Sequence, residues 1–105
     1  MKEQTYIIDK RIVQRIERCT VMESYRHRFD KTHPSNRLDR YLVHLLWISP
    51  TMQVFDTVVY SLTQPQLQYI YVQLLRMQYY EIERTEIRDE VKRLIKFLHN
   101  YYLCV

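Results

Sequence analysis

The 105-residue chain contains no glycine and no alanine. Because glycine normally occupies backbone positions with positive φ, any tight turn in this chain must use another residue. The loops that wrap phosphates in nucleotide-binding proteins and the turn that presents the serine of α/β-hydrolases both need glycine, so both are excluded in their usual form. The absence also argues against a meander of short strands, since glycine is favoured in two-residue hairpin turns.

The sequence also lacks long apolar runs. No run approaches the roughly 20 residues that cross a bilayer, and Met1–Thr5 lacks the apolar stretch of a signal peptide. Apolar residues make up 47% of the chain and charged residues 27%, which is a globular composition. We therefore expect one soluble, cytoplasmic domain over residues 1–105, without membrane contact.

Composition also bears on the source of the chain. Glycine and alanine have GC-rich codons, and arginine outnumbers lysine. This pattern favours a compositionally biased genome such as that of a virus, in which case the compartment would be the host cytoplasm.

Residues that commonly carry catalysis or bind metals are few and scattered. The four histidines, at positions 27, 33, 44 and 99, show no known metal-ligand spacing. Cys19 and Cys104 lie far apart in apolar surroundings, which favours buried thiols, although the sequence leaves a disulfide open. We expect no cofactor, no metal and no enzymatic activity, although a triad assembled from distant residues would leave no local motif.

Apolar residues recur at helical spacing in five segments of the chain. Ser49-Pro50 and Thr63-Gln64-Pro65 are typical of helix starts, because serine and threonine cap the first turn and proline is tolerated there. The pattern predicts an all-α fold, a compact bundle of about five short helices. The expected helices cover residues 5–25, 36–47, 50–62, 65–75 and 85–98.

Two of these segments have a second interpretation. Residues 53–60 and 69–75 are rich in β-branched and aromatic side chains, which are favoured in strands. The alternative is therefore an α+β domain with a small sheet built from residues 53–60 and 69–75.

The net charge of +4 is concentrated near the N-terminus. Residues 1–40 carry ten Lys and Arg against six Asp and Glu, whereas the two charge signs balance over residues 41–80 and over residues 81–105. Three arginines of the first expected helix fall within an arc of roughly 60°. The basic run comprises Arg11, Arg15, Arg18, Arg26, Arg28, Lys31, Arg37 and Arg40.

Clustered guanidinium groups suit phosphate, because each offers a planar set of donors and stays charged. Tyr25, His27 and Phe29 interleave with these cations, and planar groups stack on exposed bases. The run predicts non-specific binding of nucleic acid, DNA or RNA, in a regulatory or packaging role. The alternative is an ordinary solvated flank, in which arginines cover apolar surface and nearby carboxylates neutralise them.

The middle of the chain carries almost no charge. Asp56 is the one charged residue in positions 41–75. Interfaces are depleted in charge and enriched in aromatic residues, so the segment predicts self-association as a homodimer. The alternatives are that its polar residues simply face water, or that it binds a host protein as an adaptor or inhibitor. The candidate interface residues are Trp47, Phe55, Tyr60, Tyr69 and Tyr71.

Overall fold

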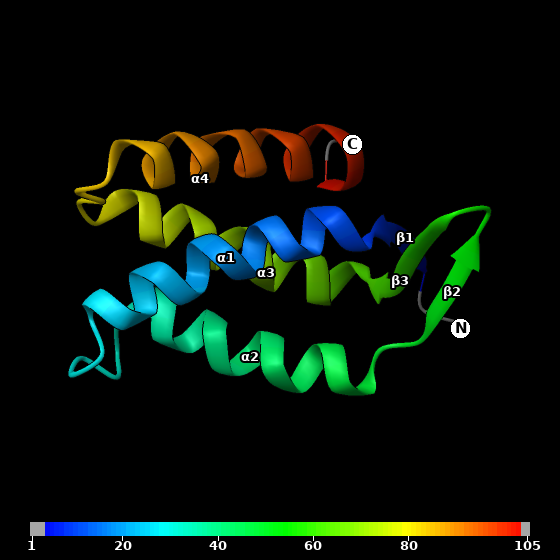
Figure 1. The fold of residues 1–105 in the computed structure, drawn as a ribbon, viewed down its shortest axis with the longest axis horizontal. Helices are drawn as coiled ribbons and strands as arrows, with labels where there is room; N and C mark the ends of the chain where they lie inside the picture. The colour runs from blue at the N-terminus through cyan, green and yellow to red at the C-terminus, as the bar shows by residue number, and fades with distance from the viewer. Residues whose placement is uncertain (1–3, 104–105) are drawn as a thin grey trace.

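Four helices and a three-stranded antiparallel sheet form an α+β fold in the computed structural model, which describes residues 4–103 (Figure 1). The prediction of an all-α bundle of five helices is therefore wrong. In chain order the elements are β1 (Thr5–Asp9), α1 (Lys10–Arg26), α2 (Pro34–Ile48), β2 (Thr51–Val54), β3 (Thr57–Thr63), α3 (Gln64–Tyr79) and α4 (Thr85–Leu98), which continues into a wider turn, His99–Leu103.

Residues 51–63, expected to be helical, form a hairpin. Val54 of β2 pairs with Thr57 of β3, which leaves Phe55 and Asp56 as a two-residue loop. Phe55 has a φ of 55°, a conformation that costs a residue other than glycine about 1–2 kcal/mol. The strand preference of the β-branched residues on both sides of the loop outweighs the missing glycine.

The alternative prediction of a small sheet is only partly right. Residues 53–60 overlap both β2 and β3, whereas residues 69–75 belong to α3. The remaining strand is β1, in a segment expected to be the first turn of a helix. Its Ile8 is fully buried and the preceding Ile7 is 54% exposed, which is the alternation of a strand.

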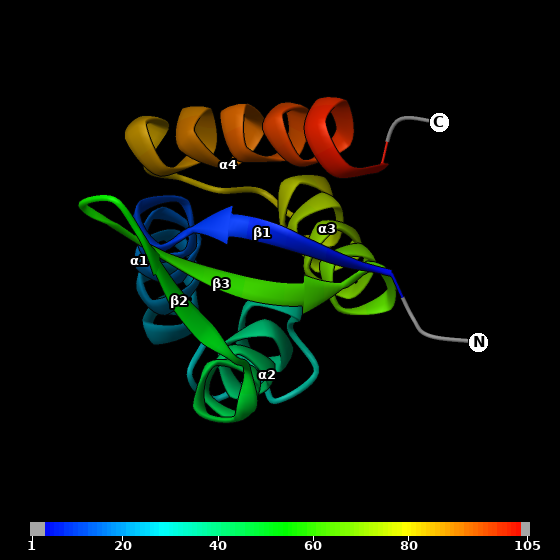
Figure 2. The ribbon, with the colours of Figure 1, turned by 90° about the vertical axis from the view of Figure 1, so that its right-hand side faces the viewer.

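The sheet lies across one end of the helices, in the order β1-β3-β2 (Figure 2). Ile8 lies opposite Tyr60 of β3, and Met52 of β2 lies opposite Val59. Because opposite residues share a face, Ile8 and Leu62 lie on the face that meets the helices. The exposed Ile7 and Met52 lie on the other face, which no helix covers (Figure 2).

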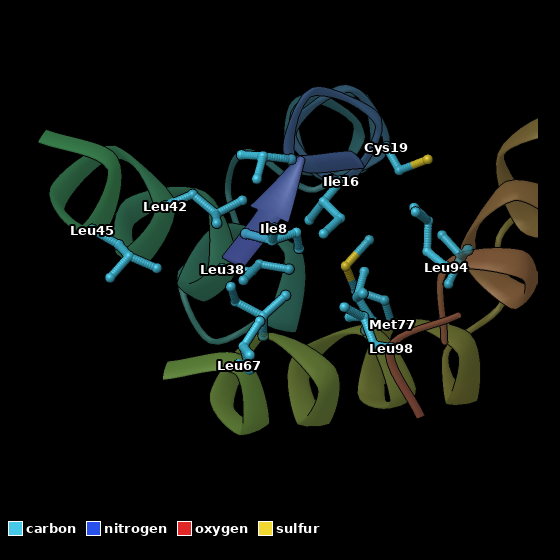
Figure 3. Packing of buried hydrophobic residues seen from close by; sticks show 14 of the residues in the cluster. Ile8, Ile16, Cys19, Leu38, Leu42, Leu45, Leu67, Met77, Leu94 and Leu98 are labelled. Atoms are coloured by element: carbon cyan, nitrogen blue, oxygen red, sulfur yellow. The ribbon is translucent and has the colours of Figure 1, made fainter. Parts of the chain in front are cut away.

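A single core joins the sheet to all four helices. Figure 3 shows Ile8 projecting from β1 among residues of α1 and α2. The predicted apolar stripe of the last helix is confirmed, because Ile87, Val91, Leu94 and Leu98 are buried. The fully buried core residues from the other elements include Ile16, Leu38, Leu45, Leu62, Leu67, Ile70, Leu74 and Met77.

Side-chain caps fix where several helices begin. Asp9 caps α1 by accepting a hydrogen bond from the backbone N–H of Arg11. Thr63 forms a capping box with Gln66, so the helix start predicted at Thr63 is confirmed. The capping residue of α2 is His33, one residue before Pro34.

Candidate nucleic-acid interface

Three of the eight predicted basic residues are already engaged by carboxylates. Arg11 pairs with Asp9 at 2.8 Å, and Arg26 pairs with Glu83. Arg15 of α1 makes a bidentate contact with Glu90 of α4, with donor–acceptor distances of 2.5 and 3.1 Å. The hydrogen bonds from Arg15 lower the pKa of Glu90. The pairs of Arg15 and Arg26 join α1 to α4 and to the segment before α4, whereas Arg11 pairs locally with the residue that caps its own helix.

The structure brings three other predicted cations together at the start of α2. Lys31, Arg37 and Arg40 line an open hollow of about 420 Å³, and each is exposed. None of them forms an ion pair with a carboxylate within residues 4–103. We call this site the basic hollow, and its lining residues are Lys31, Arg37, Arg40, Tyr41 and Tyr69.

Two half-buried tyrosines complete the hollow. Tyr41 of α2 and Tyr69 of α3 lie with their ring centroids 4.1 Å apart. Burial and the neighbouring Tyr69 raise the pKa of Tyr41, so its hydroxyl stays protonated at neutral pH. A protonated hydroxyl can donate a hydrogen bond to a phosphate oxygen, and an aromatic face can stack on a base.

The start of α2 adds to the positive potential of the hollow. Arg37 lies near the N-terminus of the helix, where the helix dipole favours anions. The backbone N–H groups of Ser35, Asn36 and Arg37 are already bonded to His33, so the dipole acts without free donors. The first turn contains no acidic residue, and Asp39 is not among the residues that line the hollow. The basic hollow is therefore suited to a negatively charged ligand.

The two remaining predicted cations lie outside the hollow. Arg28 sits over the rings of Tyr25 and Phe29, 5.0 and 4.9 Å from their centroids, on the loop between α1 and α2. Arg18 lines a separate depression with Glu86, Glu90 and Arg93. The sequence grouped all eight residues by proximity along the chain, whereas the fold divides them among several surfaces.

The predicted self-association residues also lie in different parts of the fold. Trp47 and Phe55 are 88% and 94% exposed. Tyr60 and Tyr71 pack against the protein's own core, and Tyr69 belongs to the basic hollow. Other exposed apolar residues occur on α2 and in the hairpin, and we call the set Val43, Trp47, Ile48, Met52 and Phe55 the apolar end.

A group of buried ionisable residues lies where α1 meets the start of α2. Glu23 and His33 are 1% and 4% exposed, and the imidazole of His27 stacks on that of His33 with centroids 3.8 Å apart. Glu23 lies on the buried face of α1. The sequence signal for this histidine cluster was the spacing of Glu23 and His27, which lie one helical turn apart.

Neither metal binding nor nucleophilic chemistry follows from these buried groups. Within the described part of the chain, no three His, Cys, Asp or Glu side chains are placed to hold a metal ion. Ser35 lies 2.7 Å from His33 Nδ1 but is fully buried, so this pair serves the helix cap. Cys19 is buried as expected, and burial raises the pKa of its thiol to about 11. Cys104 lies outside the described residues.

Tyr41 is the one lining residue of the hollow that sequence reasoning did not single out. It follows Arg37 by four positions, so helical spacing places it beside that arginine.

No helix among residues 4–103 is long and apolar enough to cross a membrane. Comparison of the chain with protein-family models, with curated proteins and with solved structures finds no match.

Proposed function

We propose that this protein binds single-stranded nucleic acid through the basic hollow, without base specificity. The observation that carries the proposal is the convergence of Lys31, Arg37 and Arg40 in a hollow free of carboxylates among the described residues. The cations would hold backbone phosphates. The Tyr41–Tyr69 pair would meet the sugar or base beside them, as aromatic platforms do in single-strand binders.

Binding to a labelled oligothymidine, followed by fluorescence anisotropy at increasing salt, tests this proposal. Three phosphate contacts predict a slope of about −2 in a plot of log affinity against log salt concentration. A duplex of the same length serves as the comparison, and we expect it to bind more weakly because its bases cannot reach the tyrosines. Absence of binding to either oligonucleotide at low salt would contradict the proposal.

A second candidate function is self-association through the apolar end. Its residues lie at the end of α2 and in the hairpin, at the opposite end of the molecule from the loop between α1 and α2 (Figure 1). All four residues of β2 are exposed, and among residues 4–103 its outer edge is unpaired, so its backbone can pair with a second copy. None of the five residues of the apolar end is charged, so two copies can bring these side chains together without like-charge repulsion between them.

Sedimentation of the Trp47→Glu variant tests self-association. We expect the wild-type chain to sediment as a dimer and the variant as a monomer, because a buried glutamate would lack a partner in the interface. Phe29→Glu is the matched control, since Phe29 is 90% exposed but lies in the loop between α1 and α2. A wild-type chain that stays monomeric at high concentration would rule this function out.

A further inference from the structure

The histidine cluster, which consists of the buried Glu23 and His33 and the half-buried His27, has no part in the function proposed above. Its members come from α1 and from the loop that joins α1 to α2. The two imidazoles are nearly parallel, with 8° between their planes. Side chains that titrate near neutral pH are seldom placed inside so small a core, because burial opposes their charged forms.

His33 holds the start of α2 only while its ring is neutral. The backbone N–H of Ser35 donates to Nδ1 of His33 at 3.2 Å, and the Ser35 hydroxyl lies 2.7 Å from the same atom. When Nδ1 accepts these bonds, the proton of the neutral ring lies on Nε2, which is buried without a partner in the described structure. A second proton would occupy Nδ1 and remove the acceptor of the helix cap.

Protonation of His33 would also be opposed by its surroundings. The new charge would lie at the N-terminus of α2, where the helix dipole is positive. The ring of His27 lies against one of its faces, and the ring of Tyr80 lies 5.1 Å from its centroid. Burial and the neighbouring His27 lower the pKa of His33 from its ordinary value of 6.5. The folded chain therefore binds this proton less readily than the unfolded chain, and stability is lost as the pH falls through 6.5.

Other charged groups around the cluster affect how stability depends on pH, but they do not reverse its direction near neutral pH. Glu23 Oε2 lies 3.7 Å from His27 Nε2, so the carboxylate of Glu23 belongs to the surroundings of both rings. Burial raises the pKa of Glu23 above 4.5, and protonation of Glu23 would stabilise the folded chain at lower pH. The remaining charged groups are Asp30 from the loop, Arg26 from α1, and Glu83 and Arg84 from the segment before α4.

Direct hydrogen bonds connect the cluster to the basic hollow. The backbone N–H of Arg37 donates to the carbonyl of His33 at 3.2 Å. The side-chain amide of Asn36 donates to the carbonyls of His27 and Asp30, at 2.7 and 2.5 Å. Lys31 lies within the loop that these bonds hold. Release of the cap at His33 would therefore displace Lys31 and Arg37 from the other lining residues of the hollow.

We propose that His33, stacked on His27 above Glu23, is a proton-operated latch that keeps the basic hollow assembled at neutral pH and opens it in mild acid. The inference rests on the proposed function, since it assigns the regulation of the same site. Simple electrostatics predicts the reverse pH dependence, because added protons make the surface more positive and favour nucleic acid. The sign of the change therefore distinguishes the latch from a general charge effect.

The His33→Asn variant tests the latch. Asparagine is a good capping residue that accepts from the same backbone N–H but does not titrate near neutral pH. Oligothymidine affinity is measured for both chains at pH 7.5, 6.5 and 5.5 and at constant salt. Linkage to one proton limits the change to about tenfold per pH unit, and we expect a loss of about three- to tenfold in the wild-type chain over this range. The affinity of the variant should stay level or rise.

Hydrogen exchange, measured without oligonucleotide, tests the latch independently of the proposed binding function. Hydrogen exchange of the wild-type chain should show lower protection for the first turn of α2 at pH 5.5 than at pH 7.5, with α4 unchanged as the internal control. This loss of protection in a chain that binds no oligonucleotide would overturn the proposed function and support the latch. Equal protection at both pH values, or the same pH profile of affinity in both chains, would overturn the latch. The exchange measurement also serves if the variant fails to fold.

Discussion

Replacing Arg37 and Arg40 together with glutamate should reduce the affinity for oligothymidine by about 100-fold or more at low salt. A hydrogen bond to a charged group contributes about 1.5–3 kcal/mol, and two are lost in this variant. The new carboxylates would also repel phosphate at the entrance of the basic hollow. Both side chains are exposed, so the fold should tolerate the change. Fluorescence anisotropy measures the affinity, and circular dichroism checks the helix content.

The matched control for this variant is Arg88→Glu with Lys92→Glu. These two cations are exposed on α4 and undergo the same change in net charge. If the hollow is the binding site, the control should lose only the small, salt-sensitive part of the affinity that depends on overall charge. Equal losses in both double variants would show that net charge alone attracts the ligand. A larger loss of affinity in the control would indicate that the binding site lies on α4.

Ile8→Ala should lower the free energy of unfolding by about 3 kcal/mol, the usual cost of deleting a fully buried isoleucine side chain down to alanine. Ile8 is 0% exposed and projects from β1 among α1 and α2 (Figure 3). The resulting cavity would lie where the sheet meets the helices, so the whole domain should become less stable. Urea denaturation followed by circular dichroism measures the change.

Ile7→Ala is the control, because it removes the same atoms from the neighbouring residue. Ile7 is 54% exposed on the opposite face of the strand, and we expect its replacement to cost less than about 1 kcal/mol. A large difference between the two variants supports the strand assigned to residues 5–9. Similar losses would indicate that both side chains are buried and would contradict this strand.

Helical periodicity predicted the helices correctly where the residues at the ends of the segment also favoured a helix. The stripe from Ile87 to Leu98 and the cap at Thr63 are both present in the structure. Residues 50–62 fit the same periodicity but form strands, because Val58 and Val59 are favoured in strands and Ile8 of β1 supplies a partner opposite Tyr60. That partner lies some fifty residues earlier in the chain, so local spacing could not reveal it.

The site was predictable in residue type but not in arrangement. The run of positive charge near the N-terminus includes the three cations that line the basic hollow. The carboxylates that engage Arg15 and Arg26 come from α4 and the segment before it, and local sequence reasoning cannot find such partners. Tyr69 was predicted to lie at an interface, and its contact with Tyr41 could not be foreseen because it depends on α2 and α3 packing side by side.

The hydroxyl of Tyr102 donates a hydrogen bond to the carbonyl of Ile7 at 3.0 Å, and so joins residues 95 positions apart. The same two regions supply Ile8 and Leu98 to one core. A ribosome synthesises the first strand long before the last helix. The contacts between this strand and the last helix therefore cannot form until nearly the whole domain has emerged. The order of synthesis therefore makes folding of this protein a late event, and the exposed apolar face of β1 would be a natural place for a chaperone to bind in the meantime.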